Sequence, residues 1–318
     1  MSIKALLSKS DGSDESIELG NWGSRRLSKD ELLWIDVESP GADELKILRR
    51  AVEVSDDVVQ ALHADPGLPD ARVLENAVEL VVLSVADDDD NEPAPLQILM
   101  GDGWVITRHQ TSMPSLDEHR DRISDQREVG QLTPFEFLVS LLDWHIDSFF
   151  DAAEELQSTV DELDDAALRR DDDLLQDLVS MRRRIAKVRR ILGTHREVFA
   201  ELVRPGFLTD LDESEARALR HVTDRLERAG EAITHVREML IGTFDVHMTR
   251  TAQRTNDTMK VLTLASVILL PAVVVAGIMG MNFRVPIFDD PSLFLVVIGF
   301  MVLMAVGTLA VARWRGWL

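Results

Sequence analysis

Two long apolar segments lie at the C-terminal end of a chain whose hydrophobic and polar positions are otherwise mixed. Residues 261–280 and 293–312 each contain twenty consecutive residues without a charged side chain. A bilayer core about 30 Å thick requires roughly twenty helical residues to cross it. The pattern predicts transmembrane helices at 261–282 and 293–312, joined by an outer loop at 283–292. Two buried core helices of a soluble protein are the alternative interpretation.

Positive charges flank this predicted hairpin on one side. Five basic residues lie there: Arg250, Arg254, Lys260, Arg313 and Arg315. Because Lys and Arg are enriched in cytoplasmic flanks, we expect the N-terminal part and the tail 313–318 to be cytoplasmic. Residues 1–20 hold no apolar run long enough for a signal peptide, which agrees with this orientation.

Residues 1–132 interleave strand patterns with helical ones. Strand patterns cover 32–37, 78–85, 96–100 and 104–107, and helical spacing covers 43–54 and a second helix from Val58 to Leu62. Gly101-Asp102-Gly103 is typical of a hairpin turn. The alternation predicts an α/β domain.

Residues 133–213 change to a helical pattern in two parts. Thr133 is suited to cap a helix, with Pro134 at the first helical position and Glu136 completing a capping box. The first part is acidic, whereas residues 182–190 contain six Arg or Lys. We expect an antiparallel helical pair held by opposite charges. The charged faces are either simply solvated or a surface that attracts cations near the membrane.

The segment 214–260 is expected to form the longest helix, with Ser214 as its cap. Apolar residues recur there at alternating steps of three and four: Leu219, Val222, Leu226, Ala229, Ile233, Val236 and Leu240. Such a near-heptad seam is typical of a helix packed against partner helices. If the helix continues to Met281, its 68 residues at about 1.5 Å each span on the order of 100 Å.

The amino-acid composition limits the classes of ligand and site that the chain can have. The chain has 34 Lys and Arg against 56 Asp and Glu, a net charge of −22, which disfavours nucleic-acid binding and is compatible with cations as ligands. The absence of cysteine excludes disulfides and thiolate metal sites. Four adjacent carboxylates, Asp87 to Asp90, lack the spacing of a calcium site and are interpreted as a solvated loop. No enzymatic motif is present, so no catalytic residue is expected.

Gly280-Met281-Asn282 ends the first apolar segment, nine residues after Pro271. Together with the surrounding run 254–283, this tripeptide resembles the CorA family of divalent-cation channels, whose signature is Gly-Met-Asn at this place. Segments 33–37, 96–109 and 133–147 also resemble the cytoplasmic domain of that family. The resemblance implies an α+β membrane protein in the inner membrane, a homopentameric funnel with the long helix innermost.

The resemblance also implies roles along the first crossing. Gly280, Met281 and Asn282 would form a selectivity filter. The pore-lining positions would be Asn256, Leu262, Leu270, Val273 and Gly277. A ring of Asn282 carbonyl oxygens suits Mg²⁺, which releases its waters reluctantly. Leu262 and Leu270 would form an apolar constriction, or else they serve ordinary helix packing.

Departures from the family pattern concern the choice of ion. Val273 stands where the family often has threonine, and Asp289 and Asp290 replace the usual acidic motif of the outer loop as groups that attract cations. A regulatory aspartate of the family corresponds to His221, three residues before Asp224. Imidazole is a poor ligand for magnesium and a good one for zinc, nickel or cobalt. The hypothesis is a regulatory metal site that is weakened or retuned; a solvated histidine without metal is the alternative.

The sequence therefore predicts a channel for Mg²⁺, with Co²⁺ and Ni²⁺ as further ions. It predicts no cofactor beyond transported or regulatory cations, and its expected partners are further copies of the chain and membrane lipid. A zinc transporter resembling the ZntB branch, coupled to protons, is a second hypothesis. A membrane-anchored scaffold that conducts nothing is a third.

Overall fold

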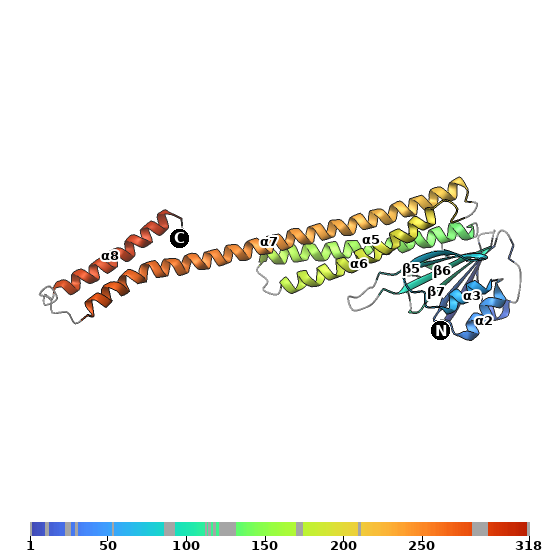
Figure 1. Ribbon diagram of the computed structural model, residues 1–318, viewed down its shortest axis with the longest axis horizontal. Helices are drawn as coiled ribbons and strands as arrows, with labels where there is room; N and C mark the ends of the chain where they lie inside the picture. The colour runs from blue at the N-terminus through green and yellow to red at the C-terminus, as the bar shows by residue number, and fades with distance from the viewer. Residues whose placement is uncertain are drawn as a thin grey trace. The chain divides into compact units, whose positions relative to one another are not determined.

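The computed structural model describes residues 2–9, 13–22, 27–28, 31–52, 54–85, 93–111, 113, 116, 119–120, 132–169, 174–208, 211–281 and 292–316 (Figure 1). The chain divides into two compact units, Met1–Thr243 and Phe244–Leu318. A mixed sheet with its covering helices makes up the first unit, and the second contains the apolar helical segments.

Seven strands form one sheet in the order β2-β1-β3-β7-β6-β5-β4. Their bounds are β1 Ser2–Ser8, β2 Asp14–Ile17, β3 Leu32–Glu38, β4 Asp70–Val73, β5 Ala77–Leu83, β6 Pro95–Gly101 and β7 Trp104–His109. All neighbours are antiparallel except β3 and β7, which are parallel. The predicted hairpin turn is confirmed, since Gly101 pairs with Trp104 and Gly103 adopts a φ of 78°, which favours glycine.

The two faces of the sheet carry two separate cores. Trp34 packs in the core shared with the long helices, whereas its neighbours Leu33 and Ile35 pack against α2 (Ala42–Ala51) and α3 (Asp56–His63). This alternation follows from the two-residue period of a strand. A short helix, α1 (Leu19–Trp22), adds Leu19 to the second core.

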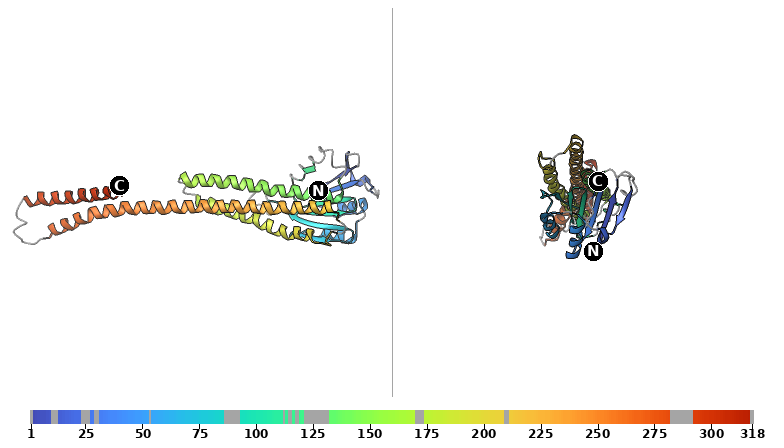
Figure 2. Two further views of the ribbon diagram at one scale, coloured as in Figure 1. Left: turned by 90° about the horizontal axis from the view of Figure 1, so that it is seen from above. Right: turned by 90° about the vertical axis from the view of Figure 1, so that its right-hand side faces the viewer.

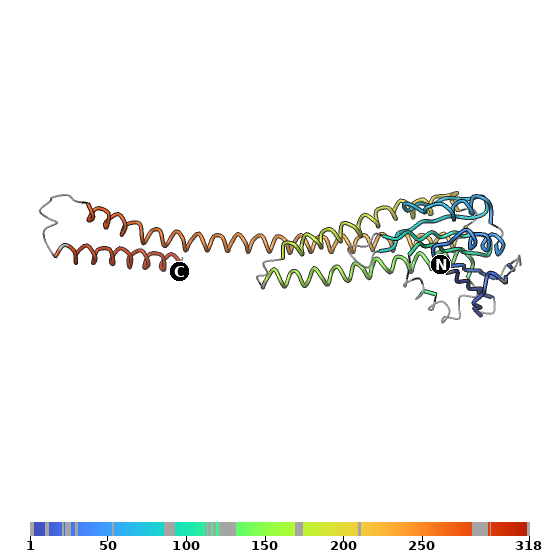
Figure 3. Tube along the Cα trace, turned by 90° about the horizontal axis from the view of Figure 1, so that it is seen from below, coloured from blue at the N-terminus to red at the C-terminus, as the bar shows by residue number. Residues whose placement is uncertain are grey.

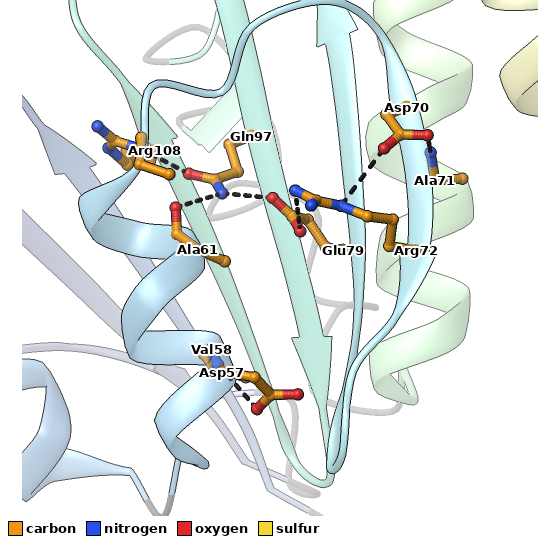
Figure 4. A network of polar contacts seen from close by, with 10 residues as sticks. Asp57, Val58, Ala61, Asp70, Ala71, Arg72, Glu79, Gln97 and Arg108 are labelled. Atoms are coloured by element: carbon orange, nitrogen blue, oxygen red, sulfur yellow. Dashed lines mark hydrogen bonds and ion pairs between the residues drawn. The ribbon is translucent and has the colours of Figure 1, made fainter.

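A buried polar network fixes the last turn of α3 on the sheet (Figure 4). Gln97 Nε2 donates to the Ala61 carbonyl at 3.0 Å and to Glu79 Oε1 at 2.7 Å. Arg108 Nη1 donates to Gln97 Oε1 at 3.0 Å and to the Ala64 carbonyl at 2.7 Å. The carbonyls at a helix C-terminus have no partners inside the helix, so strands β6 and β7 supply them here.

Asp36 is a second buried polar centre, at the end of the parallel pair β3 and β7. Its carboxylate accepts hydrogen bonds from Thr107 Oγ1 and Arg120 Nη2, both at 2.7 Å, and lies 3.2 Å from His109 Nε2. Burial opposes ionisation of Asp36, yet its hydrogen bonds outweigh that cost and lower the pKa of the carboxyl. The same contact with Asp36 raises the pKa of His109 against the effect of burial.

Two long helices, α5 (Pro134–Arg169) and α6 (Leu174–Val203), lie alongside the first part of α7 (Glu213–Met279) (Figures 2 and 3). The predicted capping box is confirmed, because Glu136 N donates to Thr133 Oγ1 at 3.1 Å and Thr133 N donates to Glu136 Oε2 at 2.8 Å. Opposite charges join the pair as expected, with Arg184 Nη2 3.0 Å from Glu155 Oε1.

The predicted seam of α7 is buried along its whole length, from Leu219 to Leu240. The predicted cap is wrong, since Asp212 rather than Ser214 caps this helix. Asp212 Oδ1 accepts hydrogen bonds from the backbone N–H of Ser214 at 2.7 Å and of Glu215 at 2.8 Å. The Ser214 hydroxyl itself donates to that carboxylate, which is the stronger acceptor.

The second unit holds the rest of α7 and the helix α8 (Ser292–Trp314). Both contain a stretch long and apolar enough to cross a membrane, and neither stretch is buried within the chain. The helix α7 continues through Pro271 without a break. The predicted boundary at residue 260 is therefore not marked by any change in the backbone.

Two buried histidines join α5 and α6 to the C-terminal end of β5. Nε2 of His145 lies 3.3 Å from Nε2 of His195, which also accepts a hydrogen bond from the backbone N–H of Leu83 at 3.1 Å. The other ring nitrogen of His195, Nδ1, is 2.7 Å from the Ile191 carbonyl. Burial lowers the pKa of His145 to about 3 and that of His195 to about 4. Both rings are thus neutral in the folded protein.

We expect this histidine pair to make the folded protein less stable at acidic pH. An unfolded histidine takes up a proton near its ordinary value of 6.5, well above the folded pKa values of about 3 and about 4. Stability therefore falls as the pH drops below about 6.5, by at most about 1.4 kcal/mol per pH unit for each histidine until its folded pKa is reached. We expect the melting temperature of His145→Leu to fall less between pH 7.5 and pH 5 than that of the natural chain. Both are measured on the full chain in detergent. An exposed control, His221→Leu, should keep the natural slope; equal slopes for all three proteins would contradict the prediction.

Candidate ion-conduction site

The five predicted pore-lining residues all lie on α7 within the second unit. At about 100° of rotation per residue, Asn256, Leu262, Leu270, Val273 and Gly277 fall within an arc of about 120° on one side of the helix. All five are exposed in the single chain, and the leucine and valine side chains are 60 to 66% exposed. One chain by itself therefore offers a helix face and encloses no pore with it.

Two polar side chains share this arc. Thr263 and Ser266 follow Asn256 at steps of seven and ten, which places them on the same side of the helix. Ser266 Oγ donates to the Leu262 carbonyl at 2.9 Å, a local bond that leaves its lone pairs available. Hydroxyl and amide oxygens are hard acceptors of the kind that Mg²⁺ prefers. The arc thus combines apolar positions with a sparse set of oxygen atoms.

The signature tripeptide begins where α7 ends. Gly280 N donates to the Ala276 carbonyl at 2.9 Å, and Met281 N donates to the Ile278 carbonyl at 3.2 Å, so the last turn tightens before the chain leaves the helix. Asn282, Asp289 and Asp290 lie outside the described residues, as does the acidic run Asp87 to Asp90. Their predicted roles stay predictions.

The predicted regulatory residues, His221 and Asp224, lie on exposed positions of α7 in the first unit. Among the residues that the structure describes, no group of three or more His, Asp or Glu side chains is arranged to hold a metal ion. A site that uses His221 or Asp224 therefore needs ligands from outside this set, such as those of a second copy.

Arg225, the next residue, is a contact that the sequence pattern did not predict. Its guanidinium joins α7 to α5 through the carboxylates of Asp143 and Asp147, and it stacks 5.7 Å from the ring of Phe150. Partial burial opposes the charge, but the two carboxylates raise the pKa of Arg225. Asp143 and Asp147 lie four residues apart on α5, so their carboxylates share one side of the helix and suit the forked donor of an arginine. This spacing is the sequence feature from which the contact could have been predicted.

These features define a class of protein: a sheet-and-helix domain followed by a long helix that continues into one of two apolar membrane-type helices. The family model described as CorA-like Mg²⁺ transporter protein matches residues 29–313. The chain belongs to this family of membrane transporters.

Individual relatives agree with this assignment. The cobalt/magnesium transport protein CorA of Thermotoga maritima is 27% identical over 223 residues, which cover 68% of this chain and 63% of that protein. The complete structure of the CorA magnesium transporter from Methanocaldococcus jannaschii covers all of both chains with a TM-score of 0.83 at 19% identity. The ZntB cytoplasmic domain from Vibrio parahaemolyticus covers 80% of this chain and all of that domain, with a TM-score of 0.64 at 13% identity. The expected fold of an α/β domain, a long helix and two C-terminal apolar helices is confirmed.

Arg225 provides a test of how α7 is held. We expect Arg225→Ala to lower the free energy of unfolding by about 1.5 to 3 kcal/mol, the value of hydrogen bonds to charged groups, because it also leaves Asp143 and Asp147 facing each other. Arg228→Ala removes an exposed guanidinium one turn further along the same helix and should change stability by about 0.5 kcal/mol or less. Melting of both variants in detergent gives the comparison; equal losses would contradict the assigned contact.

Proposed function

We propose that this chain forms a homopentameric channel that carries Mg²⁺, and also Co²⁺ and Ni²⁺, across the inner membrane into the cytoplasm. One observation carries the proposal: a continuous helix, Glu213–Met279, leads from a buried heptad seam to an exposed apolar segment that ends in Gly280-Met281-Asn282. Membership of the CorA family and the names of the relatives support Mg²⁺ and Co²⁺ among these ions.

Assembly follows from the chemistry of the exposed arc. Polar side chains on a transmembrane helix are expected to face protein or a water-filled interior rather than lipid. Thr263 and Ser266 lie within the predicted crossing on the same arc as Leu270 and Gly277, so this arc is the side that symmetric copies would turn inward. Copies around one axis would enclose a path with it, and the family resemblance implies five.

The proposed path selects ions by neutral oxygen atoms rather than by charge. Five Asn282 carbonyl oxygens at the outer mouth would hold Mg²⁺ through its water shell, and Asp289 and Asp290 would raise the local cation concentration. Leu262 and Leu270 would form constrictions that close by expelling water. An inside-negative potential supplies about 4.6 kcal/mol per 100 mV for a divalent ion, so no cofactor or energy-yielding reaction is required.

Basic flanks set the proposed orientation. Arg250, Arg254 and Lys260 precede the first apolar segment and Arg313 follows the second, so both ends of the chain would be cytoplasmic. The proposed parts are a cytoplasmic domain at 1–132, a helical hairpin at 133–213, a stalk at 214–260 and the membrane hairpin with its tail.

Flux into liposomes tests the function. We expect the purified natural protein to admit Mg²⁺, and Asn282→Ala to reduce the initial rate by about tenfold or more, because the oxygen ring at the mouth is removed. Leu303→Ala, an exposed position of α8, is the matched control and should conduct normally.

The same liposomes separate the alternatives. Zinc uptake that requires a pH gradient, without magnesium uptake, would overturn the magnesium channel in favour of a proton-coupled zinc transporter. Silence of the natural protein toward Mg²⁺, Co²⁺, Ni²⁺ and Zn²⁺ would favour a non-conducting scaffold.

His221 offers a test of regulation by internal ions. We propose that imidazole at this position weakens closing by cytoplasmic magnesium, or retunes it toward Zn²⁺, Ni²⁺ or Co²⁺. His221→Asp should close at lower internal Mg²⁺ than the natural chain, whereas Thr234→Asp, an exposed change on the same helix, should not. An unchanged dose response of His221→Asp in liposomes would refute the idea.

A further inference from the structure

The stalk part of α7 lies between two flanks of opposite charge. On one side, α5 and α7 border a groove of about 590 Å³, lined on α5 by Glu154, Gln157, Ser158 and Asp161 and on α7 by His235, among others. The charged residues of this flank are exposed. The groove is therefore an open acidic surface along the helical bundle of the first unit.

The other side is basic. Arg182, Arg189 and Arg196 recur every seven residues on α6 and are all exposed, so they share one side of that helix. Arg196 identifies this side as the edge next to α7, because its Nη2 atom lies 3.2 Å from where a Cβ atom of Gly230 would be. The two charged flanks thus lie on either side of α7.

We propose that the acidic flank of one copy receives the basic flank of the next copy and that this contact closes the ring. The proposal rests on the pentamer proposed above and adds the surface that assembles it. Neither flank is self-complementary, since like charges would meet in a two-fold dimer. An interface between different flanks repeats around an axis and generates a ring.

The axial positions of the charges agree with this contact. Arg184 meets Glu155 within one chain at 3.0 Å, so in the antiparallel pair Arg182 lies at about the level of Gln157 on α5. Rotation about an axis parallel to the bundle leaves that level unchanged. The Arg182 side chain of the next copy would then enter the groove between Glu154 and Asp161.

Engineered cysteines test the contact directly, because the natural chain contains none. Ser158→Cys and Arg182→Cys would be placed on two differently tagged copies and co-expressed, so that any disulfide between them joins separate chains. Oxidation in the membrane should give a dimer carrying both tags. Arg183→Cys is the matched control, since this exposed arginine lies about 100° further round α6 and should give none.

A charge exchange gives a second readout. Glu154→Lys with Asp161→Lys should remove the pentamer peak in native mass spectrometry, and adding Arg182→Glu with Arg189→Glu to the same chain should restore it. An acidic groove that serves free cations instead of a second copy would show no such rescue, and that result would overturn the proposal.

The outcomes separate the interface from the function. A pentamer without the disulfide between the cysteines introduced at positions 158 and 182, or with an equal disulfide to position 183, would overturn this interface and leave the channel proposal intact. A protein that stays monomeric in the membrane would overturn the pentamer itself. Crosslinking at 182 alone together with rescue by charge exchange is the expected result.

Discussion

Burial of the apolar seam on α7 is the constraint on which the rest of the first unit depends. Its seven residues are at most 6% exposed, and full burial of a large apolar side chain contributes about 1.5 to 3 kcal/mol. A helix of 67 residues gains most of its stability from such packing rather than from intrinsic propensity. The seam fixes the rotation of α7 against α5 and α6, and Arg225 holds that rotation with a forked ionic contact.

The rotation of α7 against α5 and α6 also determines which charged side chains are used within the chain and which stay exposed. The chain is strongly acidic, yet α6 carries seven of its 34 Lys and Arg residues, and the internal contacts use only part of each charged face. Arg184 and Glu155 join the two helices of the pair, whereas Arg182 and Asp161 are left on outer flanks. A charge separation of this kind contributes little to the fold of one chain, because exposed ion pairs are weak. In the proposed ring, its larger effect would be on the way that copies meet.

Local sequence patterns correctly predicted those features of the fold that depend on residues close together in the chain. The capping box at Thr133, the seam of α7 and the turn before Trp104 are of this kind. The parallel pairing of β3 with β7 joins residues about seventy positions apart, and the contact of His145 with His195 joins residues fifty apart; no local period encodes either. Strands β2 and β4 were missed because each has four residues and carries charged side chains. Strand β1 is seven residues long and was also missed, although its Ala5, Leu6 and Leu7 are buried. The pore positions came from family resemblance, and their enclosure depends on copies that one sequence does not contain.

In a symmetric oligomer, a substitution on the exposed arc of α7 is present in every copy. In the proposed pentamer one residue becomes a ring, so Val273 in place of threonine removes five hydroxyl groups from one level of the path. Discrimination between Mg²⁺ and softer ions would then rest on the oxygen atoms of Asn256, Thr263, Ser266 and Asn282. Because these groups are neutral, they would hold a hydrated ion without trapping it, which conduction requires. In the proposed channel, the choice of ion would therefore be set by a few levels of α7 and by Asn282.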